Sequence, residues 1–107
     1  MSRITYNKLI RDRIPEIIER DNKKYAVAII PPVEFDIALR EKLVEEAQEA
    51  IKADDDDLIA ELADIQEIML ALLKLHEIDE VELENVRTQR FHERGSFEKR
   101  LKLLWTE

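Results

Sequence analysis

Two pairs of carboxylate side chains at helical spacing are the residues of this sequence best suited to chemistry. Glu46 and Glu49 lie three residues apart, and so do Glu61 and Asp64. Apolar residues recur four, seven and eleven positions after both Glu61 and Asp64, so on a helix both acids would lie on the face that packs into the protein. Burying ionised carboxylates without a partner is costly. The pattern therefore predicts a compensating cation.

The donor chemistry indicates which cation this would be. The chain has no cysteine, which excludes thiolate ligands, and the four acids offer only oxygen atoms. Oxygen donors select Mg²⁺ or Mn²⁺ over zinc. Salt bridges to basic neighbours such as Arg40, Lys42 and Lys52 are the structural alternative. Lys74, the one lysine of the predicted helix over Leu58–His76, lies on the far side of that helix from Glu61 and does not pair with it.

Four helical stretches would position these acids. Apolar periodicity predicts helices within Tyr6–Asp21, over Glu34–Ala53, over Leu58–His76 and over Glu80–Glu93. Pro15 suggests that the first helix starts near it, after a turn or arm at 6–13. The acidic run Asp54–Asp57 is expected to form a turn in which Asp57 caps the next helix. A turn this short makes the second and third helices an antiparallel hairpin, which brings the two acid pairs face to face.

The ends of the chain complete the predicted fold. Gly95, the only glycine, is expected to end the last helix. Tyr25–Ile30 and Arg100–Trp105 have the length and patterning of short strands, and we expect them to pair. The predicted fold class is therefore mainly α: one domain over residues 1–107, a helical bundle built on the hairpin, with a short two-stranded β element.

Composition narrows the range of functions. The formal net charge is −8, from 25 acidic and 17 basic residues, so the chain should repel nucleic acid. The N-terminus lacks an apolar signal core and no apolar run reaches membrane-spanning length, so we expect a cytoplasmic protein. The third helix is apolar over more of its circumference than one partner helix could cover, which predicts a homodimer or homotetramer.

Three segments together resemble a known family. The acids Glu45-Glu46-x-x-Glu49, followed after eleven residues by Glu61-x-x-Asp64, resemble the metal motif of the MazG-type all-α nucleoside triphosphate pyrophosphohydrolases. Tyr6–Glu16 and Arg90–Phe97 resemble the N-terminal and C-terminal signatures of a compact subgroup described as phosphoribosyl-ATP pyrophosphohydrolase-like, with Arg90 where lysine is expected. The resemblance covers nearly the whole chain, in the right order.

The resemblance implies a reaction and a set of roles. The reaction is Mg²⁺-dependent cleavage between the α and β phosphates, which releases a nucleoside monophosphate and pyrophosphate. The metal ligands would be Glu46, Glu49, Glu61 and Asp64, and Glu45 would orient or deprotonate the attacking water. The candidates for binding the substrate phosphates are Lys8, Arg11, Lys42, Arg90 and Arg94, since arginine grips phosphate oxygens through paired donors.

Two other readings stay open at this point. The same metal cluster would serve a phosphoribosyl-ATP pyrophosphohydrolase of histidine biosynthesis, which differs only in its substrate pocket. The chain could also be a non-catalytic helical oligomerisation module, although such a module has no need of buried acids. The sequence does not name the nucleotide, because base selection depends on the shape of the pocket.

Overall fold

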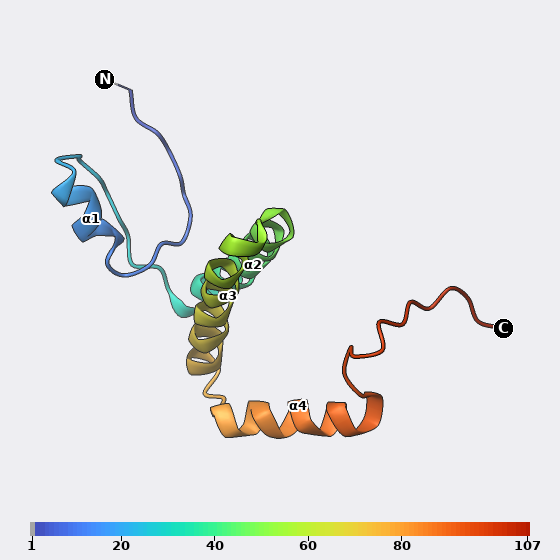
Figure 1. Cartoon of the computed structure of the whole chain (residues 1–107). Helices are drawn as coiled ribbons and strands as arrows, with labels where there is room; N and C mark the ends of the chain where they lie inside the picture. Colours follow the sequence, from blue (N-terminus) through green and yellow to red (C-terminus); the bar gives the residue numbers. More distant parts are fainter. Residues whose placement is uncertain (1) are drawn as a thin grey trace. The chain divides into compact units, whose positions relative to one another are not determined.

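The computed structural model describes residues 2–107, and its regular structure is entirely helical. The four helices are α1 (Ile14–Arg20), α2 (Pro32–Lys52), α3 (Asp55–Leu75) and α4 (Glu80–Arg94) (Figure 1). They confirm the predicted mainly α class. None of them is long and apolar enough to cross a membrane.

The predicted β element is wrong. Tyr25–Ile30 and Arg100–Trp105 both run as irregular chain, and residues 2–107 contain no strand. The alternating side chains of the first segment have nothing to pack on, since Val27 is 58% and Ile29 102% exposed. Two strands without a packed face are at best marginally stable in water.

The first helix starts where proline permits it. α1 begins at Ile14 with Pro15 in its first turn, where the N–H that proline lacks would have no partner in any case. The chain before it is irregular, and the N–H of Ile14 donates to the carbonyl of Arg11. We call residues 6–13 the N-terminal arm. The predicted arm followed by a helix near Pro15 is confirmed.

Helices α2 and α3 form the predicted hairpin. They lie side by side in Figure 1 and are joined by only two residues, Ala53 and Asp54. Leu39 of α2 and Ile68 of α3 are the buried side chains, 3% and 6% exposed. At the open end of the hairpin, the Asp36 carboxylate accepts a hydrogen bond of 2.9 Å from His76 Nε2.

The acidic run joins the third helix instead of preceding it. Asp54, in extended backbone, is the N-cap, and Asp55, Asp56 and Asp57 occupy the first turn. The prediction that Asp57 caps the helix is therefore wrong. Carboxylates in a first turn are favoured by the partial positive charge at a helix N-terminus, which offsets their mutual repulsion.

The contacts divide the chain into two units, one ending at His76 and the other spanning Glu77–Glu107. In the second unit α4 is capped at both ends. The Asp79 carboxylate accepts a hydrogen bond of 2.8 Å from the N–H of Val81. Gly95, at φ 77°, ends the helix as predicted, and its N–H donates to the carbonyl of Phe91. No residue of α4 is buried.

A stripe of apolar side chains on α2 is left exposed. Ile37, Val44 and Ile51 are 54%, 58% and 84% exposed and recur every seven residues, so they share the face of α2 that points away from Leu39. On α3, Ile59 and Leu62 are exposed at 76% and 52%. The hairpin therefore buries one side of each helix and leaves a second apolar side uncovered.

Candidate metal site

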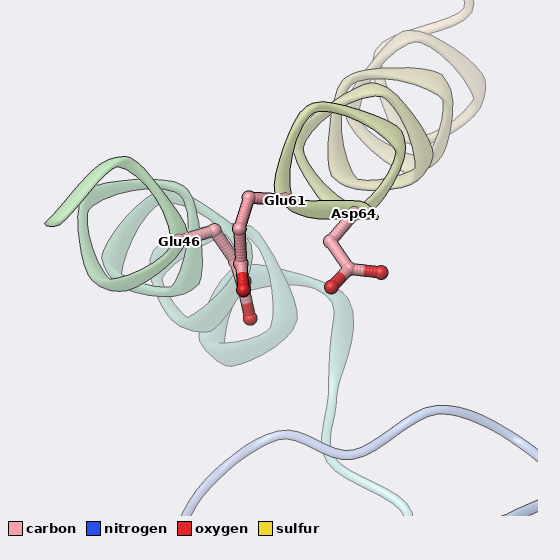
Figure 2. Close-up of side chains that lie close together, drawn as sticks. All are labelled: Glu46, Glu61 and Asp64. Atoms are coloured by element: carbon pink, nitrogen blue, oxygen red, sulfur yellow. The ribbon is translucent and has the colours of Figure 1, made fainter. Parts of the chain in front are cut away.

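Three carboxylates converge where α2 and α3 pack together. Glu46 comes from α2, and Glu61 and Asp64 come from α3. One carboxylate oxygen of each lies within 4.8 Å of the other two, and all three residues are half-buried. Figure 2 shows the side chains pointing toward one another from the two helices. The placement follows from the sequence, because Glu61 and Asp64 share the face of α3 that carries the buried Ile68.

Glu61 is the least satisfied member of this group, which we call the acid cluster. Its Oε2 atom is inaccessible to solvent and has no hydrogen-bond partner. Burial raises the pKa of the Glu61 carboxyl above its ordinary 4.5, and the negative charges of Glu46 and Glu49 raise it further. When Glu61 is protonated, it can donate that proton in a hydrogen bond to Glu46, which raises the pKa of Glu61 further. An unpartnered oxygen among like charges is the arrangement that a bound cation would satisfy.

The donor set fits a hard divalent cation. All three groups offer carboxylate oxygens, the ligands that Mg²⁺ and Mn²⁺ prefer. Glu46, Glu61 and Asp64 could therefore hold a metal ion. Glu49, the fourth predicted ligand, is exposed on α2 and lies outside the acid cluster, although its charge contributes to the raised pKa of Glu61.

Two basic residues of the N-terminal arm contact acids of the hairpin. Arg11 donates from Nη1 to Asp64 Oδ1 at 3.1 Å. Lys8 Nζ lies 3.6 Å from Glu45 Oε1. Both residues were predicted to bind phosphate, and these ion pairs were not anticipated. No signal in the sequence reveals them, because the arm is irregular and periodicity says nothing about where it lies.

The other predicted phosphate ligands fall in two places. Lys42 is half-buried on α2, one turn before Glu46. Arg90 and Arg94 are exposed on α4, in the second unit of the chain. Within the first unit, Lys8 and Arg11 thus contact acids of the hairpin, and Lys42 lies one helical turn before Glu46. Arg90 and Arg94 remain predictions.

The raised pKa of Glu61 has a consequence for stability without metal. The folded state holds a proton that the unfolded chain has already lost, so this stabilisation is complete below about pH 4.5 and disappears as the pH rises through the folded-state pKa. In EDTA, the free energy of unfolding relative to Glu61→Gln should therefore fall as the pH rises from 4.5 toward 7. Urea unfolding of the wild type and of Glu61→Gln, at equal protein concentration, measures this difference in the free energy of unfolding.

A second titrating group does not interfere with this measurement. Hydrogen bonds to His76 and, with a smaller effect, to Arg40 lower the pKa of Asp36 below its ordinary 3.8. The stability that Asp36 contributes is present above that value and is lost only at lower pH, outside the window used for Glu61. If the wild-type and Glu61→Gln curves run parallel between pH 4.5 and 7, the carboxyl of Glu61 is not in the environment described.

Comparisons with known proteins found no relative of this chain. No protein-family model, no curated protein and no solved structure matches the chain.

Proposed function

We propose that this chain is a Mg²⁺-dependent nucleoside triphosphate pyrophosphohydrolase with a MazG-like helical bundle. It would cleave between the α and β phosphates in nucleotide-pool house-cleaning. The observation that carries the proposal is the convergence of Glu46, Glu61 and Asp64, with the Oε2 atom of Glu61 buried and unpartnered. The same residues form the core of the acid motif that resembles the family.

Each acidic residue near the metal site has a role in the proposed reaction. Glu46, Glu61 and Asp64 hold the metal, and Glu49 is the candidate for a further ligand. A bound Mg²⁺ would supply charge neutralisation for the triphosphate and for the leaving pyrophosphate. Glu45, next to Glu46 in sequence, would accept the proton of the attacking water on a carboxylate oxygen. In the structure Lys8 Nζ lies 3.6 Å from the Glu45 carboxylate.

Assembly from at least two chains completes the proposed bundle. Residues 2–107 include only two buried apolar side chains, Leu39 and Ile68, which is too small a core for a stable domain of this size. A second copy would cover the stripe of Ile37, Val44 and Ile51 by two-fold symmetry, since one apolar stripe is complementary to itself. A homodimer or a homotetramer satisfies this requirement.

A pyrophosphate-release assay tests the activity. The purified chain is mixed with Mg²⁺ and each of a panel of canonical, deoxy and oxidised nucleoside triphosphates, with phosphoribosyl-ATP alongside. We expect pyrophosphate and the monophosphate from at least one triphosphate, and neither in EDTA. Turnover of phosphoribosyl-ATP alone would instead identify the enzyme of histidine biosynthesis. No turnover of any compound would favour the non-catalytic oligomerisation module.

A further inference from the structure

We propose that Arg11, assisted by Lys8, is a built-in counter-cation of the acidic face of the hairpin, which a divalent metal displaces and which then turns to the polyphosphate of the substrate. The inference rests on the proposed metal site. To that site the inference adds a role for the N-terminal arm. The arm occupies the site before the metal binds and covers the substrate after the metal has bound.

The two contacts join the arm to both helices of the hairpin. Arg11 pairs with Asp64 of α3 across a sequence separation of 53 residues, and Lys8 pairs with Glu45 of α2. Nearer acids exist, since Asp12 is adjacent to Arg11 in sequence. Arg13, two residues further on, pairs locally with Glu16 at 3.0 Å. Arg11 therefore differs from its neighbour in reaching the acid cluster.

Arg11 and a metal ion would compete for the same carboxylate. Asp64 belongs to the acid cluster, and its Oδ1 already accepts the guanidinium N–H. A divalent cation held by Asp64 and the positive charge of Arg11 would repel each other at this range. The pair is also easy to replace, because the side chains of Arg11 and Lys8 are 60% and 49% exposed and exposed ion pairs are weak.

The arm is held by its two ion pairs and by the half-buried side chains of Leu9 and Ile10. In the part of the chain that the structure describes, residues 6–10 make no backbone hydrogen bond. A released guanidinium presents paired N–H donors that match phosphate oxygens. A triphosphate bound at the metal would supply such oxygens next to the position that Arg11 has left. The charge that neutralises the acids in the empty site thus becomes a charge that binds the substrate.

Isothermal titration of Mn²⁺ into the nucleotide-free protein tests the competition. Arg11→Gln removes the competing charge and should tighten Mn²⁺ binding about threefold, in line with the strength of an exposed ion pair. Lys8→Gln should have a smaller effect, because its contact is longer and lies on Glu45. Arg13→Gln is the matched control: it removes an equal charge two residues away and should bind Mn²⁺ as the wild type does.

Trypsin provides a second measurement that uses only the wild-type chain. Cleavage after Arg11 requires its side chain to leave Asp64 and enter the protease. It should be faster with Mn²⁺ than with EDTA, and slower again when an α,β-methylene nucleoside triphosphate is added. Cleavage after Lys24, outside the arm, should not change.

The outcomes separate this inference from the proposed function. If the wild type binds Mn²⁺ but Arg11→Gln binds it no more tightly and cleavage after Arg11 ignores the metal, the counter-cation role is wrong and the metal site stands. If the wild type binds no Mn²⁺, the metal site and the counter-cation role are both wrong.

Discussion

Glu61→Gln and Asp64→Asn should each lower turnover of the preferred triphosphate by more than about 100-fold. Loss of a residue that merely orients a metal ligand typically costs 10- to 100-fold in affinity or activity, so loss of a ligand should cost at least as much. The fold should survive, because each change removes a negative charge from a group of like charges. Steady-state pyrophosphate release at saturating Mg²⁺ measures the turnover, and circular dichroism checks the fold.

A matched control lies on the same helix. Glu67 is exposed on α3, away from the acid cluster, so Glu67→Gln makes the same chemical change and should leave turnover unaltered. Glu49→Gln then decides whether the exposed fourth acid is a ligand, in which case its loss resembles that of Glu61. Wild-type turnover in either Glu61→Gln or Asp64→Asn would exclude the acid cluster as the active site.

The chain should sediment as at least a dimer at micromolar concentration, and Val44→Lys combined with Ile51→Lys should reduce it to the 12.7 kDa monomer. Both positions belong to the exposed stripe on α2, at 58% and 84% exposure. Lysines buried in an apolar interface would lack partners, which is costly. In a monomer the same lysines would lie in water, and the one at position 51 would interact favourably with the C-terminus of α2.

The double variant therefore distinguishes a dimer from a monomer by the direction in which thermal stability changes. If the stripe is an interface, the variant loses both mass and thermal stability. If the chain is a monomer, the variant keeps its mass and is at least as stable as the wild type. Lys52→Gln, in the same turn of α2 but outside the stripe, is the control and should keep the wild-type mass. A wild-type mass of 12.7 kDa would contradict the proposed assembly directly.

The parts of the structure that follow from local periodicity were predictable. The spacing of apolar residues located α2, α3 and α4 to within a few residues, because each helix must bury one face. The same spacing placed Glu61 and Asp64 on the inner face of α3, where the structure has them. Convergence with Glu46 followed because the connection between the two helices is too short to allow another arrangement.

The errors arose where local pattern competes with context. Tyr25–Ile30 has strand-like residues, but a strand requires a partner and a surface to cover, and residues 2–107 supply neither. Asp55, Asp56 and Asp57 repel one another, yet the helix N-terminus favours them more than a turn does. The contacts of Arg11 and Lys8 depend on the path of an irregular arm, which no periodicity encodes.

The two-residue connection between α2 and α3 also fixes which residues of the two helices lie at the same height along the hairpin. Six helical residues separate Glu46 from the connection on one side and Glu61 on the other, and thirteen separate Leu39 and Ile68 in the same way. The core pair and the two acids therefore stand at matching heights on the two helices. One residue inserted into α3 before Glu61 would shift Glu61 and Ile68 by about 1.5 Å along the helix axis and rotate them by about 100° relative to α2. The number of residues between Glu46 and Glu61 therefore sets the alignment of the core and of the acid cluster at once.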